Sequence, residues 1–287
     1  MVIDSHHHFW RYDATRHGWI DPLTMSALTR DFLPQDLLAA AKEGAVEGFI
    51  SVQAEQSLAE TEWLLQLADQ TAPIVGVVGW APLVDPELES LLERIHHPKL
   101  KGFRHVVQDE PDDQFLLRAD FSRGIACLTA RDLVYDLLIF ERHLPVAIEL
   151  VDKHPEQRFV LDHSAKPKIA AGELSPWREN LYSLARRPNV VCKVSGLVTE
   201  AGGNDWTPAG LRPYLDTVLD AFGPERLMFG SDWPVCLLAS SYERWLQTVQ
   251  SWAASFTEAE RACLFGATAA QVYRVDVSAV STKGVSP

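Results

Sequence analysis

Short apolar runs alternate along this chain with longer segments in which apolar residues recur at helical spacing. The short runs are rich in Val, Ile, Leu and Phe, and they predict strands over Val2–His8, Gly48–Gln53, Ile74–Trp80, Leu100–Val106, Leu133–Phe140, Phe159–His163, Val190–Ser195 and Leu227–Asp232. The longer segments predict helices that include Pro34–Glu43, Leu58–Gln70, Pro86–His96, Ser175–Arg186, Ala209–Phe222, Tyr242–Phe256 and Thr257–Tyr273. Strands that alternate with helices indicate a parallel sheet.

Eight such strands are the number that closes a single (β/α)8 TIM barrel of the α/β class, here with an extra C-terminal helix. An open doubly wound sheet is the alternative, and it usually carries a glycine-rich phosphate loop after the first strand. Histidines followed by Phe9 and Trp10 stand at that place instead, which favours the barrel. We expect the barrel to cover residues 1–277, with a frayed tail over 278–287.

Composition narrows the partners that this barrel can have. The net charge of −13 disfavours nucleic acid and anionic membranes, which bind basic surfaces. No apolar run is long enough to span a bilayer, and no leader segment precedes the first strand. The four cysteines are widely spaced without a C-x-x-C pair, so we expect free, mostly buried thiols and a cytoplasmic location. A homodimer is left open.

The first predicted strand ends in a His-x-His pair, which is the strongest chemical signal in the chain. Side chains alternate across a strand, so His6 and His8 point to one face and His7 to the other. Two imidazoles on one face can converge on a metal ion or on a substrate oxygen. A purification tag would instead sit in a flexible Ser/Gly-rich leader.

In a TIM barrel the residues at the carboxyl ends of the strands face one pocket. Each predicted strand ends in polar or aromatic residues, and together these form the candidate site: His6, His8, Gln53, Trp80, Arg104 with His105, Tyr135 with Asp136, His163, Lys193 with Ser195, and Asp232. Glu55 and Glu200 follow strand ends as further candidates. The long segment Arg11–Leu33 and the aromatic residues Trp10, Tyr12, Trp19 and Trp206 are expected to wall the mouth of the pocket.

Each member of this set has a structural alternative. Asp232 can act as a general base or as a metal ligand, or it can cap the turn that follows it. His163 can bind a metal or donate to a carbonyl oxygen, or it can be a core histidine. Arg104 can bind a substrate oxygen or support the barrel rim as an ion pair.

Lys193 lies inside a strand, where it can bind substrate or bridge buried acidic side chains. The other histidines fall in helical or loop positions and are expected at the surface: His17, His96, His97, His143 and His154.

The segments around these residues resemble the amidohydrolase superfamily, and more narrowly its amidohydrolase-2 lactonase branch of sugar-lactone and pyrone-dicarboxylate lactonases. The matching segments are residues 4–10 (DSHHHFW), 101–105 (KGFRH), 161–167 (LDHSAKP), 193–197 (KVSGL), 229–234 (FGSDWP) and 265–273 (FGATAAQVY). Binuclear members carry a carboxylated lysine on the fourth strand and a histidine on the fifth. This chain has neither at those places, which argues against a two-metal centre.

The resemblance implies a hydrolase that opens an L-fucono- or L-rhamnono-lactone to the aldonate, in carbohydrate catabolism. One zinc ion held by His6, His8, His163 and Asp232 and a metal-free reaction on the same residues both remain open. Asp232, His163 and Arg104 are the expected catalytic residues, and Gln53, Trp80, Tyr135, Trp19 and Lys193 are expected to bind substrate. The alternatives are a pyrone or dicarboxylate lactone hydrolase, a metal-dependent decarboxylase, and a non-enzymatic binding barrel.

Overall fold

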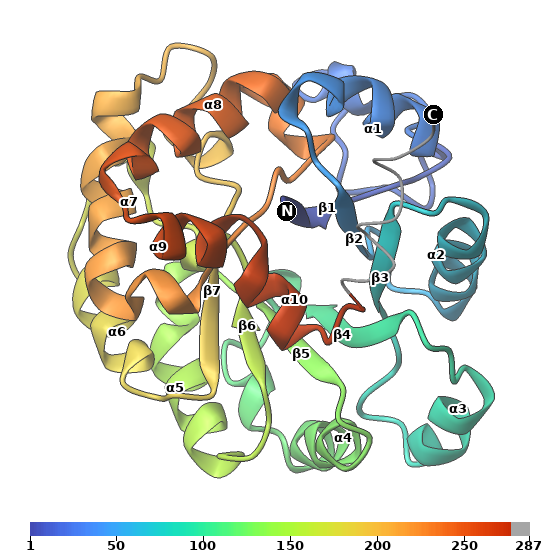
Figure 1. The fold of residues 1–287 in the computed structure, drawn as a ribbon. Coiled ribbons are helices and arrows are strands. Elements are labelled where there is room, and N and C mark those ends of the chain that lie inside the picture. Colours follow the sequence, from blue (N-terminus) through green and yellow to red (C-terminus); the bar gives the residue numbers. More distant parts are fainter. Residues whose placement is uncertain (277–287) are drawn as a thin grey trace.

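The computed structural model describes residues 1–276, and it places eight parallel strands inside a ring of helices (Figure 1). The strands follow one another around the sheet in chain order: β1 Ile3–His7, β2 Gly48–Val52, β3 Ile74–Gly79, β4 Leu100–Val106, β5 Val134–Leu138, β6 Phe159–Leu161, β7 Val190–Val194 and β8 Leu227–Phe229. A bridge between His7 and Trp233 joins the two ends of the sheet, and the His8 amide donates to the Trp233 carbonyl at 2.7 Å. The predicted (β/α)8 barrel is confirmed.

The helices that cover the barrel are α1 Pro34–Ala40, α2 Leu58–Gln70, α3 Leu88–Arg94, α4 Ala119–Ala130, α5 Leu144–Lys153, α6 Trp177–Ala185, α7 Pro208–Phe222, α8 Tyr242–Trp252, α9 Glu258–Ala262 and α10 Thr268–Val272. Side-chain caps fix several of their starts: Ser57 accepts from the Glu60 amide at α2, and Thr207 accepts from the Gly210 amide at α7. In residues 1–276, none of these helices has the length and apolar character that a membrane crossing requires.

The last predicted helix, Thr257–Tyr273, is divided in the structure. A π-helical turn over Cys263–Ala267 separates α9 from α10 and packs against β1 and β8. Gly266 lies so close to the chain start that a Cβ there would stand 2.9 Å from the Met1 carbonyl oxygen. The close approach to the first strand therefore accounts for the absence of a side chain at this position.

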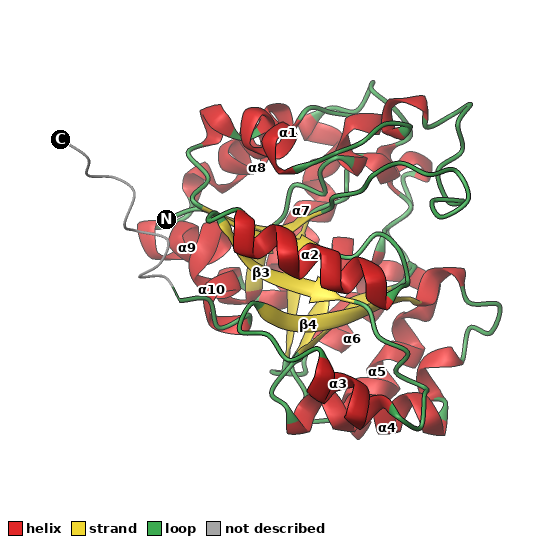
Figure 2. Ribbon diagram, turned by 90° about the vertical axis from the view of Figure 1, so that its right-hand side faces the viewer, coloured by secondary structure: helices red, strands yellow, loops and turns green. Residues whose placement is uncertain are grey.

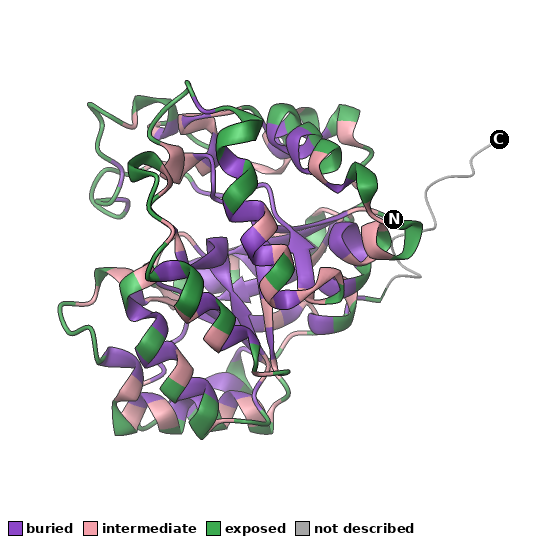
Figure 3. Ribbon diagram, turned by 90° about the vertical axis from the view of Figure 1, so that its left-hand side faces the viewer, coloured by how far each residue is buried: buried purple, intermediate pink, exposed green. Residues whose placement is uncertain are grey.

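Two apolar clusters hold the barrel together. The larger one fills the space between the strands and the helices, and Figure 3 shows the strands buried while green, exposed positions lie on the outer helices. The smaller one lies inside the barrel, where Ile3, Val78 and Met228 meet Val272 and Tyr273. α9 and α10 thus cover the end where the N-terminus lies, and the long loops lie at the opposite end (Figure 2).

β6 and β8 end earlier than the apolar pattern predicts. His163 has a φ of 52° and Asp232 a φ of 55°, and both values belong to the left-handed region rather than to a strand. The chain therefore turns sharply at each of these residues at the carboxyl end of the barrel. The predicted tail 278–287 lies outside the described residues.

The cysteine prediction is confirmed in part. All four thiols are free, and Cys192 and Cys236 are buried. Cys127, on α4, and Cys263, in the π-helical turn, are only partly buried.

Candidate active site

A pocket of about 440 Å³ opens at the carboxyl ends of the strands. Six of the predicted site residues line it: His8, Trp19, Gln53, Arg104, His163 and Asp232. His6 is fully buried directly beneath them. The residues at the carboxyl ends of the strands of a barrel face one pocket, and this rule, which we call the strand-end rule, located the pocket correctly.

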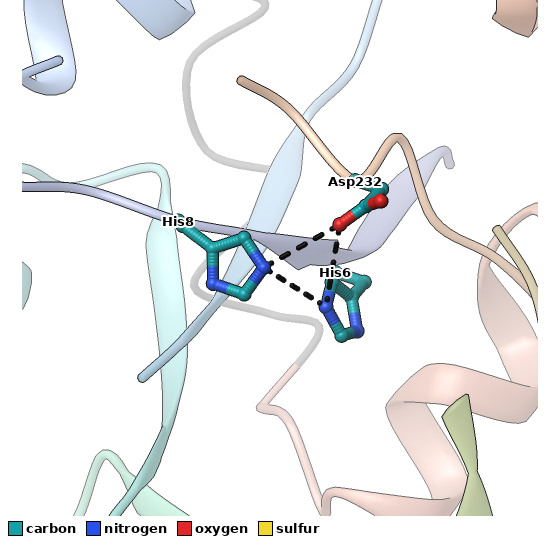
Figure 4. Close-up of side chains that lie close together, drawn as sticks. All are labelled: His6, His8 and Asp232. Carbon is teal, nitrogen blue, oxygen red and sulfur yellow. Dashed lines mark hydrogen bonds and ion pairs between the residues drawn. The ribbon is translucent and has the colours of Figure 1, made fainter. Parts of the chain in front are cut away.

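Three imidazoles and one carboxylate meet at the floor of this pocket. His8 Nε2 lies 3.2 Å from His6 Nε2 and 3.4 Å from Asp232 Oδ1. Asp232 Oδ1 is also 3.7 Å from His6 Nε2 and 3.9 Å from His163 Nε2. Figure 4 shows His6, on β1, and His8, just after it, pointing toward the carboxylate of Asp232. Residues from the first, sixth and eighth strand ends thus share one centre, and we call these four residues the histidine–aspartate centre.

The far nitrogens of His8 and His163 are held by the barrel. His8 Nδ1 donates to the Val52 carbonyl at 2.9 Å, so Nε2 is the ring nitrogen that faces the pocket. His163 Nδ1 pairs with the Ser195 hydroxyl at 2.9 Å, a group that can either donate or accept. Such outer contacts fix the orientation and the tautomer of a metal-binding or catalytic imidazole.

The position of Asp232 depends on a second carboxylate. Asp4, fully buried on β1, accepts from the Ser231 amide at 2.9 Å and from the Tyr242 hydroxyl at 3.0 Å. The Asp232 amide donates to the His6 carbonyl at 2.8 Å. These bonds anchor the turn after β8 to β1, which brings the Asp232 side chain beside the two histidines.

A layer of buried charges lies beneath the histidine–aspartate centre. Lys193 Nζ contacts Asp136 Oδ2 at 2.5 Å and Asp162 Oδ1 at 2.9 Å, and Arg104 Nη1 donates to Asp162 Oδ2 at 3.1 Å. Tyr273 of the C-terminal segment donates to Asp136 from the other side. Two cations and two carboxylates balance one another here, so the layer carries no net charge when all four are ionised.

Burial and neighbouring charges set the protonation of the centre. Burial lowers the pKa of His163 to about 4 and holds the pKa of His6 well below its usual value. Burial opposes ionisation of Asp232, but the adjacent His163 and His8 keep the pKa of its carboxyl below the usual value. Near neutral pH the centre therefore holds neutral His6 and His163 imidazoles beside an ionised carboxylate.

This set of donor atoms fits a single zinc ion. Tetrahedral zinc with bonds of about 2.1 Å places its ligand atoms about 3.4 Å apart. The ligand atoms of His6, His8 and Asp232 all lie within 4.8 Å of one another, with separations of 3.2, 3.4 and 3.7 Å, and His163 Nε2 lies 3.9 Å from Asp232 Oδ1. Neutral imidazoles and ionised carboxylates are the forms that bind metals. Arg104 Nη1, at 3.3 Å from His6 Nε2, borders the same space.

Three residues predicted to bind substrate lie elsewhere. Tyr135 is fully buried between Phe121 and Phe159 in the helix-facing core, because its strand turns that side chain outward. Trp80 does not line the pocket, and its indole N–H donates to His105. Lys193 is the bridge between buried acidic side chains, which was the structural alternative.

Several other placements also differ from expectation. Of the four aromatic residues expected at the mouth, Trp19 lines the pocket, whereas Trp10 and Trp206 are buried and Tyr12 stacks on His17. His17 and His143 were expected at the surface and are buried, and His143 Nε2 pairs with Asp113 at 2.8 Å.

The pocket also contains polar residues that the strand-end rule missed. Arg16 comes from the long loop after β1, Gln108 and Asp109 follow β4, and Lys166 follows His163. None of them stands directly at a strand end, so only the composition of the loops could have signalled them. Glu55, a further candidate, lines the pocket and lies 3.7 Å from Arg16.

A (β/α)8 barrel with imidazoles after β1 and β6 and a carboxylate after β8 defines an enzyme of the metal-binding or acid–base hydrolase type. The family model described as amidohydrolase matches residues 3–275, and the chain belongs to that family.

Three relatives extend this assignment. An L-fucono-1,5-lactonase of Burkholderia multivorans (strain ATCC 17616 / 249) is 48% identical, over 95% of this chain and 96% of that protein. An L-fucono-1,5-lactonase of Burkholderia ambifaria is 38% identical, over 96% of each. The crystal structure of an amidohydrolase from Burkholderia multivorans with bound zinc superposes with a TM-score of 0.92 at 47% identity, over 96% of this chain and 99% of that one.

Proposed function

We propose that this chain hydrolyses a sugar lactone of the L-fucono- or L-rhamnono-lactone type to the aldonate. The observation that carries the proposal is the histidine–aspartate centre at the floor of an open pocket, in a chain 48% identical to an L-fucono-1,5-lactonase. A cytoplasmic location, a role in carbohydrate catabolism and a homodimer belong to the same proposal.

Asp232 is the group that removes a proton from the attacking water. Its carboxyl is ionised near neutral pH and faces the pocket, as a general base must. After attack, the protonated Asp232 can return the proton to the ring oxygen as the ester bond breaks. Arg104 and His163 line the same pocket and can donate to the carbonyl oxygen as negative charge develops on it.

His6, His8, His163 and Asp232 are the residues that would hold a zinc ion. When bound, the ion supplies a Lewis acid at the carbonyl. Without it, His163 donates through Nε2–H while its Nδ1 accepts from the Ser195 hydroxyl. Gln53 and Trp19 line the pocket wall, where they can contact the hydroxyls and the apolar edge of the sugar.

The charges of the pocket favour a substrate with few anionic groups. Arg16 lies near Glu55, and Arg104 is occupied by Asp162 and Gln53. These cations are already matched by protein groups, whereas a dicarboxylate lactone requires two that are free. The pyrone-dicarboxylate alternative is therefore less favoured.

The test is turnover of a panel of aldonolactones, followed with a pH indicator, before and after chelation and after zinc is added back. We expect turnover by the parent chain and a loss of at least about 100-fold in kcat for Asp232→Asn. Turnover by Asp232→Asn within tenfold of the parent would show that Asp232 is not the base. Failure to hydrolyse any lactone in either metal state would refute the proposed function.

A further inference from the structure

Beyond the histidine–aspartate centre, the pocket contains one cation that no carboxylate of residues 1–276 contacts at ion-pair distance. Lys166 lines the pocket, and within those residues no carboxylate lies at ion-pair distance from its ammonium, although the carboxylates of Glu200 and Asp232 attract it from further away. The ammonium lies 5.5 Å from the centre of the Phe140 ring. Lys193 and Lys168, by contrast, both pair with carboxylates.

An unusual backbone turn places this ammonium in the pocket. The four residues from His163 to Lys166 all have positive φ values of 52°, 52°, 59° and 50°, and none of them is glycine. Residues other than glycine adopt this left-handed conformation at an energetic cost, usually singly. Four in a row form one left-handed turn that directs His163 and Lys166, three residues apart, into the same pocket.

Surrounding groups hold the turn in place. The Trp177 indole donates to the Ser164 carbonyl at 2.7 Å, and the Ser164 hydroxyl donates to the Lys193 carbonyl at 3.3 Å. The Lys166 amide donates to the His163 carbonyl at 2.9 Å. The fold thus maintains a strained segment that places an ammonium without a direct ion-pair partner in the same pocket as His163 and Asp232.

We propose that Lys166 binds the carboxylate that the reaction generates, and so also the anionic oxygen that precedes it. This inference rests on the proposed lactonase activity. A sugar lactone is neutral and its aldonate carries one negative charge, so a cation that no protein carboxylate contacts directly interacts more strongly with the charged species than with the substrate. One ammonium without a direct ion-pair partner can bind one carboxylate.

The experiment measures product binding and turnover separately in Lys166→Met. We expect the inhibition constant of the aldonate to rise at least about tenfold, while binding of the neutral alditol of the same sugar stays within twofold. The value of kcat/KM should also fall, because the anionic oxygen loses its cation. Lys166→Arg, which keeps the charge, should recover part of both losses.

The matched control is Lys168→Met, two residues further along. Lys168 is exposed, lies outside the pocket and pairs with Glu141 at 3.0 Å, so its loss should leave aldonate binding and turnover unchanged. Equal effects of the two variants would indicate a general charge effect and overturn the proposal.

Lys166→Gly separates binding from folding. Glycine suits a φ of 50°, so this variant should melt at a higher temperature than the parent while it binds the aldonate more weakly. A purely structural lysine would lose stability instead. If the parent turns over lactones and Lys166→Met keeps its aldonate affinity within twofold, the inference fails; if the parent turns over no lactone, the proposed function fails.

Discussion

The buried charge layer beneath the site makes a quantitative prediction about Lys193. Lys193→Met leaves Asp162 paired with Arg104, but Asp136 then keeps only the Tyr273 hydroxyl. One uncompensated carboxylate remains, and breaking a buried ion pair in this way typically costs about 3–5 kcal/mol. Asp136→Asn alone should cost less, about 1–3 kcal/mol, because the amide oxygen still accepts from Lys193 and Tyr273.

The double variant Lys193→Met/Asp136→Asn has no unpaired charge in the layer. We therefore expect it to be more stable than Lys193→Met alone, by about 2 kcal/mol, although it carries one more substitution. Urea unfolding followed by circular dichroism and by tryptophan fluorescence gives the free energies of unfolding. If the loss of unfolding free energy in the double variant equals the sum of the losses in the two single variants, within about 0.5 kcal/mol, the reasoning from charge balance is wrong.

Three further variants test the described contacts. Tyr135→Phe should keep kcat and KM within twofold and shift stability by less than about 1 kcal/mol, since Tyr135 packs in the helix-facing core; a large rise in KM would restore it to the pocket. Gly196→Ala should lower kcat about 100-fold, because Gly196 has a φ of 69° and the new Cβ would stand 2.5 Å from His163 Nδ1. An unchanged kcat, with the His163 ring undisplaced in a crystal structure of the variant, would show that this is wrong. Burial raises the pKa of Glu60 from 4.5 to about 8, so between these pH values the folded chain keeps a proton that the unfolded chain has lost. The contribution of this group to the free energy of unfolding therefore falls as the pH rises from about 4.5 toward 8. Glu60→Gln should therefore gain stability relative to the parent between about pH 5 and pH 8, and a constant difference across that range in urea titrations would contradict this.

The sequence was sufficient to predict the strands and the floor of the pocket. The spacing of apolar residues and their high content identify a buried parallel strand. The geometry of a barrel then brings the carboxyl ends of all the strands together. This is why His6, His8, His163 and Asp232 could be placed in one centre without any knowledge of the loops.

The walls of the pocket could not be predicted in the same way. Tyr135 and Asp136 are adjacent, and only the register of β5 decides that Asp136 faces inward and Tyr135 outward. A strand pattern that is apolar on both faces does not reveal that register. Lys166 reaches the pocket through a left-handed turn, a conformation that its residue type disfavours.

The seam that closes the barrel passes through the histidine–aspartate centre. The His7–Trp233 bridge and the Asp232 amide bond to the His6 carbonyl close the ring of strands with the same segments that supply the imidazoles and the carboxylate. A growing polypeptide that has reached the seventh strand therefore holds its histidines but lacks Asp232. Such a nascent chain has not yet assembled the histidine–aspartate centre, which is complete only after the eighth strand has left the ribosome and docked against the first.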